Sequence, residues 1–509
     1  MLRSHTTKTI AILSLLIGAA TMLFGGTLAQ TYGGALTSAF GATGVRGFDS
    51  WRDTTGVETH VYNLIYDKLV WYDETYTLRP GLFESWTSDD AQTWIFQIRP
   101  GVVWHDGVPF TAQHVIDYFD TLSDPASGAS TEKSIILDGV SYEALDDMTV
   151  QMVLPEPNAV LLDRLDLHYI ARTSDFDADN PVGTGPFRLT EWNRNQSLIF
   201  SKNENYWRDQ LPYLDEVTLM MVPDATTRLN LLLTGEIDVA ARVSVGEVER
   251  LQALDGVEVI TTPGEYSTIH HYMLYKTSVP PFDNKLVRQA INYAIDREVM
   301  LDINFGFGSV KSNAIGEGSI YFNPDAISYN ERDVERAKEL MEEAGYTPGQ
   351  EAFEVSLFYW QEWPENIQIV QIIQANLAEI GISVKLELLE IGTWVDLVIA
   401  KHEYEMALTA LIPGWDPDSQ LANVYVTDDG SALEWENAEF LAAWAAGRAT
   451  ADIDERTAAY ATAQEVAMEE APAVVLNTVP SFVAHGSSVQ NLKRHDSGNL
   501  NYESAWLMR

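Results

Sequence analysis

The sequence contains no cysteine among its 509 residues. Disulfide bonds, thiolate zinc sites, iron–sulfur clusters and cysteine nucleophiles are therefore excluded, and stability must come from packing. Several enzyme signatures are also missing: the sequence has no G-x-S-x-G nucleophile elbow, no H-E-x-x-H zinc motif and no G-x-x-x-x-G-K-[ST] phosphate-binding loop. The common marks of hydrolases and nucleotide-dependent transferases are thus absent.

Basic residues are scarce. The chain has 32 Lys and Arg against 74 Asp and Glu, a formal net charge of −42. A negative charge of this size repels phosphate backbones and anionic headgroups, so nucleic acid is not expected as a partner. The acidity is best explained by solubility in a salty or extracellular medium. A hydrophobic fraction of 46% indicates a packed globular protein. Because one core rarely grows beyond ~300 residues, we expect two or more lobes.

Only one long apolar run is present, from Ile10 to Phe24. Arg3 and Lys8 precede it and small residues follow it up to Ala29, which predicts a secretory signal peptide over residues 1–29. The run is shorter than the ~20 residues that span a membrane, which disfavours an anchor. Since no cysteine follows the signal, a lipoprotein anchor is excluded, and we expect a soluble protein in the periplasm.

Strand and turn signals dominate the first half of the chain. Residues 93–98 and 149–154 alternate apolar and polar side chains, as half-buried strands do. The polar turn at 193–196 separates two extended segments and predicts a hairpin. Residues 216–240 then show the pattern of a strand, a helix opened by Asp224, and a second strand.

The second half changes to long amphipathic helices after Pro280-Pro281. Helices are predicted over 333–344 and 366–380, and each ends at a glycine. Alternation over 382–388 predicts a strand that faces the second of these helices. This half is therefore predicted to form an α/β lobe, with more helix than the β-richer first half.

Several longer blocks resemble the solute-binding proteins of ABC importers in the dipeptide, oligopeptide and nickel group, known as extracellular solute-binding family 5. The hallmark segment of that family resembles residues 86–112, which contain WIFQIRPGVVWHDGVPFTA. Further blocks follow in the family's order and extend the resemblance over essentially all of the chain after the signal: PVGTGPF (181–187), NENYW (203–207), LTGEIDV (233–239), VRQAINYAID (287–296), AGY (344–346) and WDPD (415–418).

The resemblance implies an α/β fold with two lobes, the type II, cluster C-like form of periplasmic binding protein, and an extra subdomain on the first lobe. Lobe I then comprises residues 30–55, 183–270 and 480–509, the subdomain 56–182, and lobe II 271–479. The implied function is capture of a peptide or peptide-like solute by lobe closure, followed by delivery to a membrane permease with separate ATPase subunits. Neither catalysis nor a cofactor is implied, and a monomer is expected.

The resemblance also suggests which residues contact the solute. They are expected in the glycine loop, near the mature N-terminus and in lobe II: Phe40, Gly183, Thr184, Gly185, Trp394, Trp415 and Asp416. Other blocks have a structural interpretation. His105-Asp106-Gly107 is predicted to form a turn that satisfies local backbone groups, and Arg288 and Asp296 to hold helix ends.

Two departures from the family concern the solute. Peptide binders place an aspartate three residues before the acidic-Pro pair, and here that position is Pro413. Dipeptide receptors place an arginine in the segment that here reads FYWQEWP (358–364). Clamping of a short zwitterionic peptide by charge pairs is therefore not expected. The 14 tryptophans and 22 tyrosines suit stacking, and oligosaccharide, opine-like and metal-chelate solutes are left open.

A different class of function is a secreted, metal-independent hydrolase. It needs paired titratable groups with separated pKa values in a cleft. The acidic pairs Asp89-Asp90 and Asp428-Asp429 lie in polar contexts and are predicted to be solvated. His270-His271 would point to opposite sides of a strand, so no metal site is predicted there.

Overall fold

The computed structural model describes residues 30–508, apart from 53–55, 74–76, 131–134, 262–268, 348, 361–365, 412–413, 415, 427–431, 480 and 495–499. The predicted signal peptide, Pro413, Trp415 and the pair Asp428-Asp429 lie outside the described residues. Within these ranges, no helix is both long enough and apolar enough to cross a membrane.

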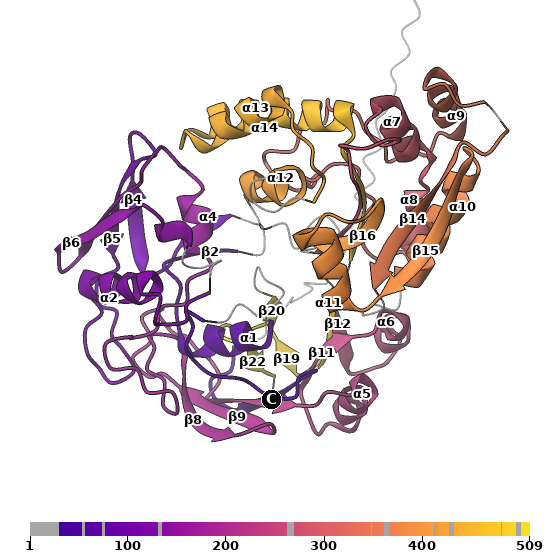
Figure 1. The fold of residues 1–509 in the computed structure, drawn as a ribbon. Helices are drawn as coiled ribbons and strands as arrows, with labels where there is room; N and C mark the ends of the chain where they lie inside the picture. Colours follow the sequence, from indigo (N-terminus) through magenta and orange to yellow (C-terminus); the bar gives the residue numbers. More distant parts are fainter. Residues whose placement is uncertain are drawn as a thin grey trace, which may run out of the picture.

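A seven-stranded sheet forms the body that we call lobe I (Figure 1). Its strand order is β12-β18-β11-β1-β10-β9-β8, in which β1 runs parallel to β10 and β11 and the other neighbours are antiparallel. The strands are β1 (Ala35–Phe40), β8 (Phe187–Asn193), β9 (Ser197–Lys202), β10 (Glu216–Met221), β11 (Val239–Val243), β12 (Val257–Thr261) and β18 (Phe482–Gly486).

Local sequence signals fix the helices of lobe I. Asp224 accepts a hydrogen bond from the Thr227 amide at the start of α5 (Ala225–Thr234), and Gly235 ends this helix with a left-handed φ of 74°. The predicted strand, helix and strand over 216–240 are therefore confirmed as β10, α5 and β11. The helix α6 (Val245–Gln252) follows β11, and the predicted hairpin is β8 paired with β9.

A four-stranded antiparallel sheet of order β4-β5-β7-β6 forms the body that we call the subdomain. The predicted strand over 93–98 is β5, and the strand predicted over 149–154 is β7, one residue shorter. The elements of this part are α1 (Gly56–Ile65), β2 (Val70–Tyr72), β3 (Leu78–Pro80), β4 (Phe83–Thr87), β5 (Thr93–Ile98), α2 (Ala112–Ser123), η1 (Ile135–Leu137), β6 (Ser141–Asp146), β7 (Thr149–Val153) and α4 (Leu161–Leu165).

A mixed five-stranded sheet of order β15-β14-β16-β13-β17 forms lobe II. Its strands are β13 (Ile269–Tyr275), β14 (Phe353–Trp360), β15 (Ile382–Leu389), β16 (Met406–Leu411) and β17 (Ala473–Val479). The helices are α7 (Lys285–Ala294), α8 (Arg297–Ile303), α9 (Val334–Glu343), α10 (Asn366–Ala378), α11 (Ile391–Trp394), a π-helical turn η3 (Val395–Ala400), α12 (Pro417–Tyr425), α13 (Ala438–Arg448) and α14 (Ile453–Glu470). The helices predicted over 333–344 and 366–380 are thus confirmed as α9 and α10.

Short strand pairs complete the chain. They are the β2–β3 pair of the subdomain and, near the C-terminus, β19 (Val489–Gln490) with β22 (Trp506–Leu507) and β20 (Lys493–Arg494) with β21 (Leu500–Asn501).

The buried apolar residues divide the molecule into two bodies. The largest cluster joins lobe I to the subdomain: Leu36 of β1, Phe96 of β5 and Val483 of β18 all belong to it. Separate clusters fill lobe II, around Met273 and Tyr272 on opposite faces of β13. Among the described residues, no buried cluster contains members from both bodies. The expected two-lobed α/β fold is confirmed, with the subdomain packed onto lobe I.

Candidate functional site

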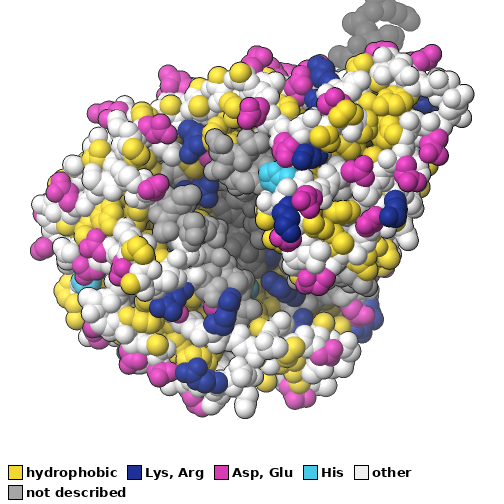
Figure 2. All heavy atoms as spheres, viewed as in Figure 1, with side chains coloured by type: hydrophobic (Ala, Val, Ile, Leu, Met, Phe, Trp, Pro, Cys, Tyr) yellow, Lys and Arg dark blue, Asp and Glu magenta, His cyan; other side chains and the backbone are white. Residues whose placement is uncertain are grey.

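The face shown in Figure 2 is hollowed between the subdomain and lobe II. Lys and Arg side chains border this hollow, although acidic residues outnumber basic ones 74 to 32 in the chain. We call this hollow the cleft. Figure 1 shows α4 of the subdomain next to α12 of lobe II, and hydrogen bonds join the two helices.

Polar contacts join the two bodies where α4 meets α12. One oxygen of Asp163 accepts a hydrogen bond from the Ser419 hydroxyl at 3.1 Å, and the other accepts one from the Asp416 amide at 3.2 Å. Nearby, the Ala159 amide donates to the Arg448 carbonyl at 2.7 Å. These contacts between described residues of the subdomain and lobe II are polar, as is common at interfaces between domains.

Three buried carboxylates gather at this contact. Asp416 caps α12 and forms an ion pair with Arg456, whose Nη2 lies 2.8 Å from both of its oxygens. Arg448 lies 3.3 Å from Asp418. Burial, followed by the charge on Asp416, raises the pKa of Asp163 to about 6. Burial also raises the pKa of Asp418 to about 7. Asp163 and Asp418 at the contact between the lobes therefore both have a pKa raised toward neutral pH.

The predicted residues of lobe I pack against α1. Phe40 ends β1, is 4% exposed and sets its ring edge-on to His60 of α1, 4.5 Å away. The Gly185 amide donates to the carbonyl of Ile65 at the end of α1. A Cβ on Gly183 would lie 1.8 Å from that same carbonyl oxygen, so only glycine permits this approach.

His105 holds the glycine loop from its other side. Its Nδ1 accepts from the Gly183 amide at 3.3 Å, and its Nε2 lies 3.0 Å from the Gly185 carbonyl. Burial lowers the pKa of His105 to about 4, so the ring is neutral at pH 7 and its Nε2–H donates to that carbonyl. Gly107 has a φ of 88°. The predicted turn is confirmed, and Asp106 accepts from the Val108 amide within it, but both ring nitrogens of the histidine bond to the distant glycine loop and not to local backbone groups.

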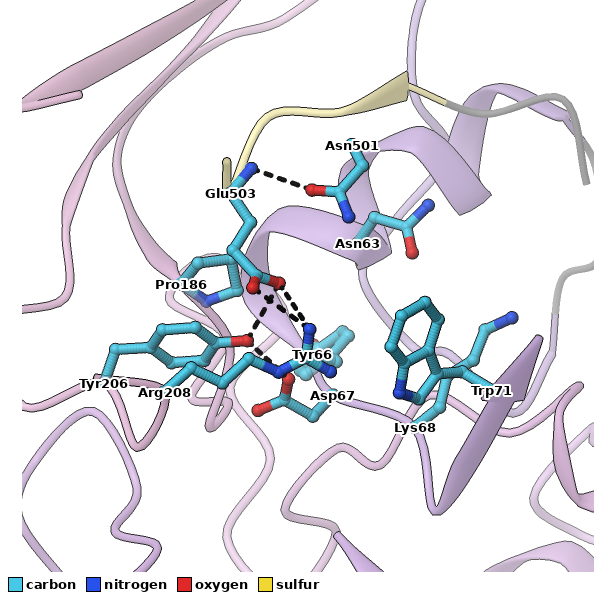
Figure 3. Close-up of a pocket in the computed structure, with 10 residues that line it drawn as sticks. All are labelled: Asn63, Tyr66, Asp67, Lys68, Trp71, Pro186, Tyr206, Arg208, Asn501 and Glu503. Carbon is cyan, nitrogen blue, oxygen red and sulfur yellow. Dashed lines mark hydrogen bonds and ion pairs between the residues drawn. The ribbon is translucent and has the colours of Figure 1, made fainter. Parts of the chain in front are cut away.

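Thr184, between the two glycines, is fully buried and donates to Asp67 at 2.9 Å. Tyr206 and Trp207 of the NENYW block also donate to Asp67, at 3.0 and 2.8 Å. Figure 3 shows Tyr206 and Arg208 converging on Glu503, near the C-terminus, beside Asp67. This network, which we call the Asp67 network, joins four segments of the chain, at Asp67, Thr184, residues 206–208 and Glu503.

The cavity beside Asp67 is small, and a neighbouring cavity of about 150 Å³ is lined by Arg208 and Glu503. The cavity drawn in Figure 3 measures about 40 Å³, which suits a water molecule, whereas pockets for small solutes measure roughly 300 Å³ or more. Its charges are also satisfied, since Lys68 pairs with Asp166 at 3.0 Å and Arg208 with Glu503 at 3.0 Å. The motif residues Thr184, Tyr206 and Trp207 thus fasten the subdomain to lobe I.

Trp394 lies in lobe II at the junction of α11 and the π-helical turn η3. It is 4% exposed, and its ring lies 4.8 Å from that of Trp360 at the end of β14. Among the described groups, none accepts a hydrogen bond from its Nε1–H. The buried indole N–H groups of Trp51, Trp104 and Trp444 likewise lack an acceptor among the described groups, and that of Trp394 would gain one if a solute accepts from it.

The structure places the predicted residues in two groups. Phe40 and the glycine loop lie in lobe I against α1, and Trp394 and Asp416 lie in lobe II. Their contact with a solute stays a prediction, as does that of Trp415, which lies outside the described residues. Sequence reasoning missed Asp163 and Asp67. No motif marks Asp163. Asp67 could have been sought, because Thr184, Tyr206 and Trp207 lie in motifs, carry hydrogen-bond donors and need an acceptor once they are buried.

Known proteins show which family has this sequence and fold. The model of bacterial extracellular solute-binding proteins, family 5 Middle, matches residues 77–432, more than half of the chain. The glutathione-binding protein GsiB of Escherichia coli (strain K12) is 27% identical over 461 residues, which cover 86% of this chain and 88% of that protein.

Solved structures agree. The periplasmic binding protein DppA from Helicobacter pylori, in complex with the peptide STSA, is 30% identical with a TM-score of 0.74, covering 94% of this chain and 99% of that one. HbpA2 from Haemophilus parasuis, 22% identical, shares the fold with a TM-score of 0.84, covering 93% and 100%. With the family model, these matches confirm the resemblance seen in the motifs. The chain belongs to the bacterial extracellular solute-binding proteins, family 5.

Proposed function

We propose that this chain captures a peptide or peptide-like solute in the cleft and delivers it to the permease of an ABC importer, with ATPase subunits as separate chains. The proposal includes export by the signal at residues 1–29, a periplasmic location and a monomer. It takes the lobe boundaries as predicted: 30–55, 183–270 and 480–509 for lobe I, 56–182 for the subdomain and 271–479 for lobe II.

The observation that carries the proposal is the division of the buried apolar residues. Lobe I shares its core with the subdomain, whereas lobe II has its own. Two rigid bodies with separate cores can rotate without breaking either core, which is how hinged binding proteins close. A solute favours the closed state only through contacts that it makes with both bodies. The residues proposed to make them are Phe40, Gly183, Thr184 and Gly185 on one side and Trp394, Trp415 and Asp416 on the other.

The charge pairs at Asp416 constrain how a solute amine is held. Both oxygens of Asp416 accept from Arg456, and one of them also caps α12 through the Asp418 amide at 2.9 Å. An amine that binds Asp416 must therefore compete with a buried guanidinium. This supports a solute held by stacking and by hydrogen bonds, such as one to the free Nε1–H of Trp394, rather than by an amine clamp.

Native mass spectrometry of the protein purified from its host tests the proposal, because a tightly held solute survives gentle purification. The expected result is a bound peptide mass at one per chain, together with a smaller radius of gyration by X-ray scattering than that of the stripped protein. A saccharide, opine-like or metal-chelate mass keeps the receptor role and replaces the solute class. Turnover of the solute during incubation, or scattering profiles unchanged by the returned solute, contradicts the receptor role.

A further inference from the structure

A second cavity lies in lobe I, where the parallel strands end. It measures about 250 Å³ and is bounded by α5, α6 and the end of β11, which Figure 1 shows side by side. Strands β1, β10 and β11 run parallel, and α5 and α6 begin just after β10 and β11. In open α/β sheets, ligands bind outside the carboxyl ends of parallel strands. We call this cavity the arginine pocket, for its residues Arg228, Arg242 and Arg250.

Arg242 has an unusual backbone. It lies in a bulge of β11, where the register with β18 shifts between Ala241 and Val243, and its φ is +55°. A side chain other than glycine, asparagine or aspartate seldom occupies this left-handed region, and such strain concentrates at functional positions. Bulges also redirect the side chain that they carry. Here the redirected side chain belongs to the lining of the pocket.

The Arg242 side chain is exposed and available. In the described part of the chain, no carboxylate lies within ion-pair distance of its guanidinium. This is notable in a protein where acidic residues outnumber basic ones 74 to 32. An unpaired guanidinium presents a planar fork of N–H donors that matches a carboxylate or phosphate.

The other two arginines support the charge of Arg242. Arg228 is 4% exposed, and its donors go to backbone carbonyls, including those of Ala241 at 3.1 Å and Val222 at 2.7 Å. Among the described residues no carboxylate hydrogen-bonds to Arg228, although the charge of Asp224 acts on it, and these carbonyls hold its guanidinium in place. Arg250 is offset by Glu247, to which its Nε donates at 2.7 Å. The pocket therefore carries a net positive charge from Arg228 and Arg242.

We propose that the arginine pocket binds the anionic group of a small molecule, a carboxylate or a phosphate, with Arg242 as the direct donor and Arg228 as a fixed supporting charge. The hydroxyl of Ser244, at the start of α6, lines the same pocket and forms no capping hydrogen bond, so it is free to donate as well. The anion has two possible sources: the transported solute itself, in which case the inference rests on the proposed function, or a free anion bound separately.

Titration of the stripped full-length protein with inorganic phosphate tests the site, by calorimetry and thermal shift, against sodium chloride at equal ionic strength. The wild type should bind phosphate, and Arg242→Gln should bind it about tenfold or more weakly, the effect of losing charge-assisted hydrogen bonds. The control Arg194→Gln removes another arginine from lobe I, 65% exposed and paired with Asp179, and should bind like wild type.

Arg242→Gly guards against misfolding, because glycine suits a φ of +55° and relieves the strain. It should keep or raise the thermal midpoint and still lose phosphate binding. Wild-type affinity in both Arg242 variants, or a wild type that responds to phosphate only as it does to chloride, overturns the site.

Native mass spectrometry of Arg242→Gly then separates the two sources. Loss of the solute that co-purifies with the wild type places the anionic group on the solute. Retention of that solute, with phosphate binding lost, identifies a free anion. If the wild type carries a solute and closes on it but ignores phosphate, the pocket fails and the receptor role stands.

Discussion

The carboxylate of Asp163 in α4 accepts a hydrogen bond from the hydroxyl of Ser419 in α12 across the boundary between the two bodies, at 3.1 Å and 256 residues apart in the chain. This contact and its neighbours join the subdomain to lobe II at a boundary that no apolar cluster of described residues crosses. Its strength must therefore depend on the charge state of Asp163, which is held close to Asp416.

Acidification should favour contact between the lobes. The pKa of Asp163 is raised from 3.8 to about 6, and that of Asp418 from 3.8 to about 7, chiefly by burial. A carboxyl with a raised pKa binds protons more tightly in the buried state, so the penalty of burying its charge is absent near pH 4 and develops as pH rises toward 7. The radius of gyration of the stripped protein should therefore fall between pH 8 and pH 5.5, as X-ray scattering can measure.

The variant Asp163→Asn should lose part of this pH response, because its amide keeps the shape of the carboxyl without titrating. Asp89→Asn, which changes an exposed aspartate of the subdomain, serves as the control and should respond like wild type. A scattering profile of Asp163→Asn that depends on pH as strongly as that of the wild type contradicts the role given to Asp163.

Local features of the fold were predictable because they depend on neighbours in the chain. Asp224 and Gly235 bound α5 as predicted, since capping and a left-handed φ act within one turn. The alternation over 93–98 likewise predicted β5. The motif at 183–185 was visible too, but its partners Asp67 and His105 are 117 and 78 residues away. No local pattern encodes such pairings.

The least predictable features are those that arise from tertiary strain. Arg242 shows no sequence signal, because a bulge depends on how β11 meets β18 and not on the residues of β11 alone. Asp416 is a similar case. Its motif WDPD suggested a ligand contact, which stays a prediction, and did not reveal that Asp416 caps α12 and pairs with Arg456, 40 residues later. Packing determines which side chains are buried and paired. The motif therefore drew attention to Asp416 but could not predict its surroundings.

Removing Arg456 should destabilise lobe II. Burial alone would lower the pKa of Arg456, but the charge on Asp416 raises it above its usual value, so Arg456 stays protonated. Arg456→Met leaves the buried Asp416 carboxylate without its partner, which typically costs about 3–5 kcal/mol of unfolding free energy. Urea unfolding measures this loss. Arg336→Met, at an exposed and solvent-screened pair with Glu339, should shift the urea midpoint far less.

The double variant Arg456→Met with Asp416→Asn sharpens this test, since it removes the stranded charge together with its partner. It should recover a part of the stability that Arg456→Met loses. If Arg456→Met unfolds at the same urea concentration as Arg336→Met, the pair does not hold α12 to α14.

Glycine is required at position 183 for steric reasons. A Cβ there would lie 1.8 Å from the Ile65 carbonyl oxygen, so Gly183→Ala must push the loop away from α1 and strain the Asp67 network. We expect a loss of about 2 kcal/mol or more in unfolding free energy, as for other overpacked cores. The matched control is Gly246→Ala in α6, where the nearest atom is 3.9 Å away and the helix gains from alanine. Equal stability of the two variants would contradict the steric argument.

The unpartnered indole of Trp394 leads to a prediction about solute affinity. Its Nε1–H makes no hydrogen bond among the described residues, so Trp394→Phe should cost little stability beyond the smaller ring. If the solute accepts that hydrogen bond, the dissociation constant for the co-purified solute should rise about tenfold in Trp394→Phe, measured by calorimetry. Trp94→Phe is the converse control, because the Trp94 indole already donates to the Ala91 carbonyl at 3.0 Å inside the subdomain. That variant should lose about 1 kcal/mol of stability and keep its affinity, and an unchanged affinity in Trp394→Phe removes this residue from the binding surface.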